Sequence, residues 1–260
     1  MTTTDSSPPL LHCHEGVATI TLNRPAQRNR LENGDLQTLL QHFAKINEDL
    51  RIRVVVLTAN TKDQPKPVFC AGYDIGGFAE PDQGSTAFEK VPEALAQLRP
   101  ITICALNGSV YGGATDMVLA CDLRLGLMDL AWRMPAAALG LHYYPSGLLR
   151  YVNQFGVAAA KRAFLTGNVF SGTELHTLGV LEVMKDAASL QSAVNQLLSE
   201  VLNMAPIAVQ ATKRSINEIA AGQYNAAVLR EREMESTRTD DFAEGLKAFA
   251  ERRKPVFKGQ

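Results

Sequence analysis

The sequence predicts an α/β fold followed by a helical C-terminal region. From residue 16 to about residue 125, short β-branched segments alternate with segments of helical periodicity, the order expected of an α/β protein. Beyond about residue 155 the segments have helical periodicity and are separated by Gly, Ser and Pro. A length of 260 residues with 46% apolar composition is enough to bury a large core.

The first elements follow from local patterning. Residues 16–25 (GVATITLNRP) alternate and are β-branched, so they predict a strand that its proline ends. Residues 35–50 carry apolar side chains at helical spacing and predict a helix capped by Asn33 or Asp35. Residues 52–60 (IRVVVLTAN) predict a strand covered on both faces, because apolar or β-branched residues follow one another without alternation.

The next elements bring two glycine turns. Residues 68–75 (VFCAGYDI) predict a short strand that runs into the first turn, and a polar loop then leads to a helix over 86–98. Residues 100–110 predict another buried strand, and a helix begins near Gly112. The later helical segments are 156–167, 171–180, 189–205, 206–222 and 240–254.

Composition excludes several classes of function. Twenty-six basic and 27 acidic residues leave a formal net charge of −1, too little to attract nucleic acid or an acidic membrane over distance. No apolar run approaches the roughly 18 residues of a membrane span. Residues 1–10 predict a disordered leader without the features of a signal peptide, which favours a cytoplasmic protein. The four widely spaced cysteines predict free thiols rather than disulfides or metal ligands.

The two glycine turns, residues 69–75 and 110–116, each follow a predicted strand. Glycine allows the backbone to turn sharply and approach a ligand, which leaves N–H groups that can point into a site. In the second turn Gly112 and Gly113 also begin a helix, whose positive end favours an anion. If the turns lie together, they form an oxyanion hole that stabilises an enolate or tetrahedral oxyanion. The alternative is a pair of ordinary strand-to-helix turns.

FCAGYDI together with NGSVYGGATDMVLACDLRL (107–125) resembles the paired signature of the crotonase, or enoyl-CoA hydratase/isomerase, superfamily. The resemblance extends over about residues 15–258, including VATITLNRPAQRNRLE and APIAVQATKRSI. It implies a ββα spiral core over residues 11–200 and a helical trimerisation region over 201–260. It also implies a coenzyme A thioester as substrate, a homotrimer or dimer of trimers, and no metal or redox cofactor.

By this resemblance, the backbone N–H groups of Tyr73 and Gly113 form the oxyanion hole. The other residues of the two turns that would contact the substrate are Ala71, Gly72, Asp74, Ile75 and Gly112.

Hydratases of this family carry one glutamate in the helix after the paired glycines and a second in a later segment. By the resemblance, the first position is Asp116 and the second is Ala136, which would line the substrate site. Addition of water across a double bond needs two carboxylates that share the water. This chain keeps at most one, on a shorter side chain. The alternative role for Asp116 is that of a carboxylate satisfied by backbone N–H groups near a helix N-terminus.

The segment LGLHYYPSGL (139–148) takes the place of the second glutamate. It clusters His142, Tyr143 and Tyr144 where the family closes its acyl pocket. Together with GSVYGGATDM, it resembles methylmalonyl-CoA decarboxylase and similar crotonases, which use a tyrosine at the position of Tyr143 and lack the hydratase pair.

A decarboxylase needs no base, because loss of CO₂ itself produces the enolate. Tyr143 would orient the substrate carboxylate, and His142 or Asp116 would assist protonation of the carbanion. His142 has an alternative as a surface or packing residue. One departure weakens the resemblance: the related decarboxylases carry His directly after the Ala-Gly of the first turn, whereas this chain has Tyr73.

Two further segments are expected to bind the substrate. NRPAQRNRLE resembles the family segment along the nucleotide and pantetheine, so Arg28 and Arg30 are candidates to bind CoA phosphates, with a solvated basic loop as the alternative. FAERRKPVFKG resembles the C-terminal helix that closes over acyl-CoA, often in a neighbouring subunit. It would bring Phe249 and Lys258 to the ligand, although Phe249 suits a core equally well.

Three functional hypotheses follow. The first is an enzyme that works through a thioester enolate without the hydratase pair, as a decarboxylase or other C–C lyase. The second is a hydratase or isomerase with Asp116 as its sole carboxylate, and the third is a non-catalytic acyl-CoA-binding scaffold. Two donors focused on one carbonyl argue against a mere scaffold. Ala136 argues against hydration but not against isomerisation, which can run on one base.

Overall fold

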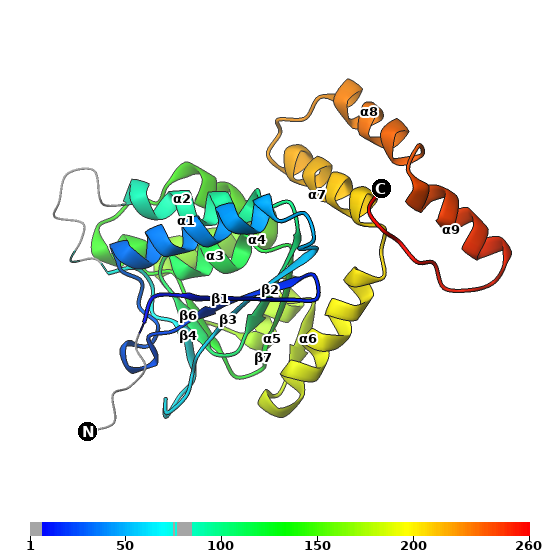
Figure 1. Cartoon of the computed structure of the whole chain (residues 1–260). Coiled ribbons are helices and arrows are strands. Elements are labelled where there is room, and N and C mark those ends of the chain that lie inside the picture. The colour runs from blue at the N-terminus through cyan, green and yellow to red at the C-terminus, as the bar shows by residue number, and fades with distance from the viewer. Residues whose placement is uncertain (1–6, 75, 77–84) are drawn as a thin grey trace.

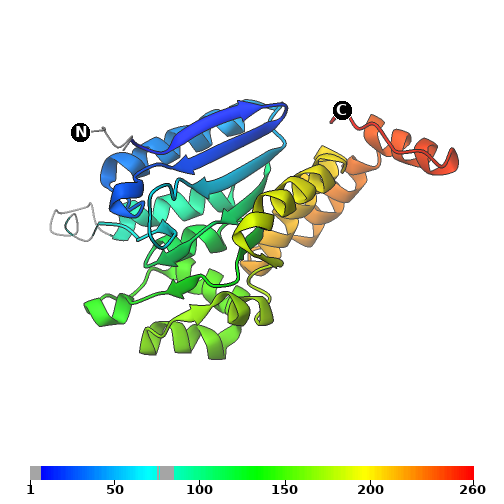
Figure 2. The ribbon, with the colours of Figure 1, turned by 90° about the horizontal axis from the view of Figure 1, so that it is seen from below.

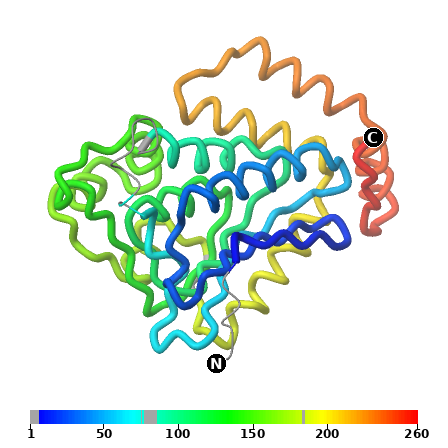
Figure 3. The backbone as a smooth tube through the Cα atoms, turned by 60° about the vertical axis from the view of Figure 1, so that its left-hand side comes forward, coloured from blue at the N-terminus to red at the C-terminus, as the bar shows by residue number. Residues whose placement is uncertain are grey.

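The computed structural model describes residues 7–74, 76 and 85–260, and it confirms the α/β prediction (Figure 1). Two β-sheets form the centre of the molecule. Helices α1 to α4 lie on one side of the larger sheet, and α8 and α9 extend away from it (Figures 1 and 2). The tube in Figure 3 shows the same separation of the C-terminal segment from the sheets. None of the helices in the described ranges has the length and hydropathy to cross a membrane.

The larger sheet has six strands in the order β1-β2-β3-β5-β7-β10. Only β1 and β2 pair antiparallel, and the other pairs are parallel. Every residue of β5 and all but one of β3 are buried, as their unbroken apolar runs predict. The strands are Leu10–His14 (β1), Val17–Leu22 (β2), Val54–Ala59 (β3), Ile101–Leu106 (β5), Leu123–Leu127 (β7) and Val183–Lys185 (β10).

The smaller sheet has the order β4-β6-β8-β9, with β4, β6 and β8 parallel. Its strands are Val68–Cys70 (β4), Ser109–Tyr111 (β6), Ala131–Arg133 (β8) and Phe170–Ser171 (β9). Both glycine turns follow strands of this sheet, β4 and β6. Because these two strands are parallel neighbours, the turns emerge at the same edge.

The single strand expected over residues 100–110 is two strands in different sheets, β5 and β6. The chain leaves the larger sheet at Asn107, whose side-chain amide donates to the Ala59 carbonyl over 2.7 Å. Gly108 then passes so close to β4 that a Cβ there would lie 2.7 Å from the backbone nitrogen of Phe69. The apolar run ends at Leu106, and only Val110 of β6 is buried.

The helices are Asn33–Glu48 (α1), Ser85–Ala96 (α2), Ala114–Leu119 (α3), Pro145–Thr166 (α4), Gly172–Thr177 (α5), Ala187–Leu202 (α6), Pro206–Ala220 (α7), Ala226–Ser236 (α8) and Asp240–Ala250 (α9), with short 3₁₀ turns at Pro25–Gln27 and Ala136–Leu139. Neither Asn33 nor Asp35 is the N-cap of α1. Glu32 holds that position, and its N–H donates to the Asp35 carboxylate over 2.9 Å. Helix α4 is divided at Gly156, which has a non-helical φ of 69°. The part after Gly156 matches the helix expected from residue 156, whereas the part from Pro145 was not predicted.

The core joins both sheets. Trp132, Tyr151, Phe69 and Phe170 are among its largest fully buried side chains. All four cysteines are free, as the sequence predicts; Cys13 is exposed and the other three are buried. Burial raises the pKa of the Cys70 thiol to about 12, so this cysteine stays a protonated packing residue.

Candidate active site

The two glycine turns touch one another. A Cβ at Gly72 would lie 3.0 Å from the Tyr111 carbonyl oxygen, and a Cβ at Gly112 would lie 3.8 Å from the Gly72 Cα. Gly72 and Gly112 have φ values of 102° and 57°, in the region that favours glycine. Both positions therefore favour glycine for their conformation, and Gly72 also for the close approach of the two backbones.

The first turn is anchored to the segment before α1. The Leu31 N–H donates to the Gly72 carbonyl and the Asp74 N–H donates to the Leu31 carbonyl, each over 2.9 Å. Neither bond uses the N–H of Tyr73, which lies between them. The Tyr73 hydroxyl donates to the side-chain oxygen of Asn33. The turn is thereby fixed by backbone bonds on both sides of the predicted oxyanion donor. Ile75, predicted to bind substrate, lies outside the described residues.

The second turn leads directly into α3. The Gly112 N–H donates to the Arg133 carbonyl over 2.9 Å, whereas the Gly113 N–H has no acceptor within the described parts of the chain. A Cβ at Gly113 would lie 2.7 Å from Cε1 of Phe88, so the Phe88 ring packs directly on this residue. An N–H at a helix start beside an aromatic ring is a suitable donor to an oxyanion.

Asp116 lies in α3 with its side chain fully buried. Its carboxylate accepts hydrogen bonds from the Tyr144 hydroxyl over 2.6 Å, from Nε of Arg150 over 2.8 Å and from Nη2 of Arg150 over 2.6 Å. Its partners are therefore side chains around the start of α4, not the backbone N–H groups of the alternative considered above. Both carboxylate oxygens are engaged.

Tyr143 and Tyr144 form a stacked pair beside Asp116. Their ring centroids are 4.1 Å apart, and the Tyr143 hydroxyl donates to the Tyr144 hydroxyl over 2.8 Å. The hydroxyl hydrogen of Tyr144 is donated to the Asp116 carboxylate, which only accepts. The Tyr144 oxygen can therefore only accept from Tyr143. Burial, and next the charge of Asp116, raise the pKa of both phenols. The two tyrosines are therefore protonated hydrogen-bond donors rather than acids.

Arg150 connects Asp116 to the rest of the site. Burial acts to lower the pKa of its guanidinium, but hydrogen bonding to Asp116 and the charge of Asp116 together outweigh it and raise that pKa. Nη2 also donates to the Ser146 hydroxyl over 3.4 Å, and Ser146 donates to Glu89 of α2 over 2.8 Å. The network thus joins α2, α3 and α4. Sequence reasoning missed Arg150, Ser146 and Glu89, and it chose Tyr143 rather than Tyr144 as the site residue.

Two predicted residues of the acyl site have side chains that make no hydrogen bond within the described residues. Ala136 is buried at the start of its 3₁₀ turn and offers no carboxylate. His142 is exposed and makes no polar contact with any residue in the described ranges, so its role in protonation stays a prediction. The same ranges contain no cluster of three His, Cys, Asp or Glu side chains that could hold a metal ion.

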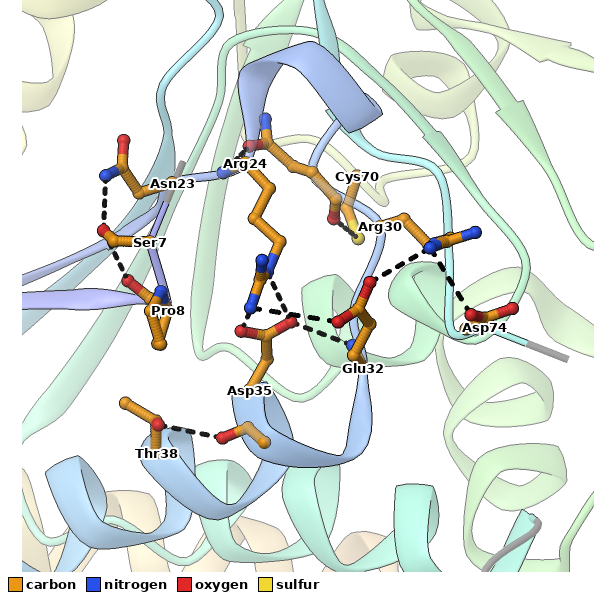
Figure 4. Close-up of polar contacts among 12 residues, drawn as sticks. Ser7, Pro8, Asn23, Arg24, Arg30, Glu32, Asp35, Thr38, Cys70 and Asp74 are labelled. Carbon is orange, nitrogen blue, oxygen red and sulfur yellow. Dashed lines mark hydrogen bonds and ion pairs between the residues drawn. The ribbon is translucent and has the colours of Figure 1, made fainter. Parts of the chain in front are cut away.

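The two candidate phosphate ligands differ in their surroundings. Nη2 of Arg30 lies 3.0 Å from Glu32 and 3.4 Å from Asp74, so two carboxylates already engage its charge (Figure 4). Arg28 is exposed, and its guanidinium lies 5.9 Å from the centroid of the Tyr111 ring. The Arg28 carbonyl accepts from the Ala71 N–H over 2.9 Å. Arg28 therefore stands at the glycine turns with its charge available, and it suits a phosphate better than Arg30 does.

The C-terminal candidates lie away from this cluster. Phe249 of α9 is 87% exposed, so it is not a core residue of its own chain. Lys258 is also exposed, and its backbone N–H donates to Asp241 over 2.7 Å. Figures 1 and 2 place α9 far from α3, so within one chain neither residue joins the site.

Known proteins resemble the whole chain. The family model "Enoyl-CoA hydratase/isomerase" matches residues 12–260. Enoyl-CoA hydratase domain-containing protein 2, mitochondrial, of Homo sapiens is 34% identical over 266 aligned residues, covering 95% of this chain and 87% of that protein. The 2,3-dehydroadipyl-CoA hydratase of Escherichia coli (strain K12) is 29% identical over 250 residues, covering 94% and 96%. The crystal structure of enoyl-CoA hydratase from Bacillus anthracis matches with a TM-score of 0.86 at 28% identity, covering 98% and 100% of the two chains.

Proposed function

Because the chain belongs to the enoyl-CoA hydratase/isomerase family and has the crotonase fold, we propose that it cleaves a C–C bond beside an acyl-CoA thioester, most simply by decarboxylation. One observation carries the proposal: both oxygens of Asp116 accept hydrogen bonds from Arg150 and Tyr144, and Ala136 supplies no second carboxylate. Water addition needs a carboxylate pair free to move protons, and the hydrogen bonds of Asp116 argue against such a pair here.

The proposed reaction uses the two glycine turns. The thioester oxygen accepts from the N–H groups of Tyr73 and Gly113. The bond between Cα and the substrate carboxylate breaks, its electron pair enters the enolate, and CO₂ leaves. A proton then adds to Cα and gives the shortened acyl-CoA. Two fixed donors stabilise the enolate as its charge develops, and losing one such donor typically costs about 10² to 10³ in rate.

The acyl pocket supplies orientation. Tyr143 is buried beside Tyr144, and its hydroxyl hydrogen can turn from Tyr144 to a substrate carboxylate. The rings of Phe88 and Tyr144, with centroids 6.5 Å apart, would give the bound acyl group an apolar wall. A carboxylate bound there loses much of its hydration, which favours conversion into neutral CO₂. His142, exposed at the edge, is the proposed route for the proton.

Hydration or isomerisation is the second candidate. The names of similar proteins favour it, among them the 2,3-dehydroadipyl-CoA hydratase of Escherichia coli. In this case Asp116 would be the sole carboxylate and would carry a proton between carbon atoms or from water. To do so, one of its oxygens must give up a hydrogen bond from Arg150 or Tyr144.

The deciding experiment is mass spectrometry of the purified protein with crotonyl-CoA, a 3-enoyl-CoA and methylmalonyl-CoA in separate reactions. Gain of water, movement of the double bond by chromatography, and loss of CO₂ identify the three reactions. We expect loss of CO₂ without hydration. Hydration or isomerisation at a substantial rate would mean that Asp116 works as a base despite Arg150.

We also propose a homotrimer or dimer of trimers in which α9 of one subunit approaches the site of the next. The support is an apolar surface on α9, where Phe242, Leu246 and Phe249 are 44%, 59% and 87% exposed. Light scattering coupled to size-exclusion chromatography tests the assembly. A monomer at micromolar concentration would contradict it.

A further inference from the structure

The ion pair of Asp116 and Arg150 has a geometry that a loose surface contact lacks. Two parallel hydrogen bonds, Nε to Oδ1 and Nη2 to Oδ2, join the guanidinium to the carboxylate over 2.8 and 2.6 Å. The Asp116 side chain is 0% exposed and that of Arg150 is 17% exposed. A buried bidentate pair of this kind holds both partners in one orientation.

We propose that Arg150 is a positioning residue that neutralises Asp116, so that the acyl pocket admits an anionic acyl group and Asp116 does not act as a base. The inference rests on the proposed function in taking the acyl group, with its own carboxylate, to lie beside Gly113. It adds the residue that makes binding of such an anionic acyl group possible.

The charges around the pair support this role. Within the described residues, Arg150 is the only cation bonded to the network of Asp116, Tyr144, Tyr143, Ser146 and Glu89. Glu89 lies one hydroxyl farther away, beyond Ser146, and is partly exposed, so solvent screens it. Without Arg150, the buried charge of Asp116 would therefore have no compensating cation in this network.

A lone carboxylate there would have two effects. It would repel a second carboxylate on the substrate, because charge interactions weaken little in a buried site. It would also have an oxygen free of the Arg150 hydrogen bonds, which could accept a proton from Cα of the substrate as a general base. Arg150 prevents both effects.

The first test compares dissociation constants of succinyl-CoA and butyryl-CoA by isothermal titration calorimetry. The two acyl chains are similar in length, but only succinyl-CoA carries a second carboxylate. We expect Arg150→Met to raise the dissociation constant of succinyl-CoA by about tenfold or more relative to that of butyryl-CoA. Asp116→Asn together with Arg150→Met removes both charges and should return the ratio close to that of the wild type. Arg162→Met is the control, since Arg162 also lies on α4 but pairs with Glu174 on the surface.

Two single variants keep the test decisive if Arg150→Met does not fold. Asp116→Asn leaves Arg150 without its carboxylate partner and should therefore strengthen the binding of succinyl-CoA relative to that of butyryl-CoA. Arg150→Lys keeps the charge, so it should keep most of the succinyl-CoA affinity. Equal changes for both ligands in every variant would overturn the proposal, because a structural role would not depend on ligand charge.

The second test follows deuterium entering Cα of butyryl-CoA in D₂O by mass spectrometry. We expect no exchange above the buffer rate with wild type, measurable exchange with Arg150→Met, and none with the double variant. Wild-type exchange as fast as that of Arg150→Met would overturn the proposal. The binding ratios do not depend on turnover. A protein that shows them but releases no CO₂ from methylmalonyl-CoA would refute the proposed reaction and leave the role of Arg150 intact.

Discussion

The hydroxyl of Tyr144 donates to Oδ2 of Asp116 over 2.6 Å. Tyr143 donates in turn to Tyr144, so the hydroxyl hydrogens of both tyrosines point along a chain that ends at the carboxylate. A substrate carboxylate competes most easily for the outer member of this chain, because moving the Tyr143 hydrogen leaves the bond between Tyr144 and Asp116 unbroken. The first prediction follows from this order.

We expect Tyr143→Phe to lower kcat for CO₂ loss from methylmalonyl-CoA by about 10- to 100-fold, the value of one hydrogen bond to a charged group. Asp116→Asn should cost less, because loss of CO₂ needs no base. Steady-state kcat and KM for both variants measure the difference, and Tyr224→Phe, at a tyrosine that is 56% exposed, is the matched control. Equal losses in the two site variants would leave neither role supported.

Gly113→Ala should abolish turnover while the protein still folds. The added methyl group would lie 2.7 Å from Cε1 of Phe88, so the ring or the turn must shift and the oxyanion donor moves with it. We expect kcat/KM to fall by at least about 10²-fold. Gly34→Ala is the control, because a Cβ at Gly34 meets nothing within 4 Å. Circular dichroism spectra identical to wild type, with kcat/KM unchanged in Gly113→Ala, would contradict the displacement of this N–H by the added methyl group.

The sequence predicted the glycine turns because their signals are local. A strand, a glycine and a helix start lie within a few residues of one another, and parallel pairing of β4 with β6 then brings Gly72 and Gly112 together. The position of Asp116 could be predicted for the same reason. Its neutralisation by Arg150 could not, because the two residues are 34 positions apart on different helices.

Arg150 was missed for a second reason. Only the part of α4 that follows Gly156 was predicted, and Ser146 and Arg150 lie in the part before this non-helical residue. The break between β5 and β6 falls at Asn107 and Gly108, where Gly108 lies against the backbone of Phe69 on a neighbouring strand.

A buried ion pair attaches α7 to the larger sheet, and removing its cation should destabilise the protein. Nζ of Lys213 lies 2.7 Å from Oδ2 of Asp122 and donates to the Pro100 carbonyl over 2.8 Å. We expect Lys213→Met to lower the free energy of unfolding by about 3 kcal/mol, because it leaves a largely buried carboxylate unpaired. Urea unfolding measures the change. The double variant Lys213→Met with Asp122→Asn should lose less free energy of unfolding than Lys213→Met alone. Equal losses in the two variants would contradict a role for the pair.

The last prediction concerns Glu244 of α9, which attaches the chain after this helix, at Arg253 and Val256, to the helix itself. Its carboxylate accepts from both terminal nitrogens of Arg253, over 2.5 and 2.9 Å, and from the Val256 N–H over 2.9 Å. Hydrogen bonding from Arg253, followed by that from Val256, lowers the pKa of Glu244 from its ordinary value of 4.5 to about 2. The folded state therefore favours the ionised form.

A carboxyl group whose pKa is lower in the folded state stabilises that state above its unfolded pKa, and the contribution disappears as pH falls through the folded pKa. The Tm difference between wild type and Glu244→Gln should therefore be constant above about pH 5.5, shrink below pH 4.5 and approach zero near pH 2. Glu231→Gln, at an exposed position of α8, should show no such trend. Differential scanning calorimetry from pH 7 downward measures both. A difference that grows on acidification would reverse the sign and show that Glu244 is protonated more easily in the folded chain than in the unfolded one.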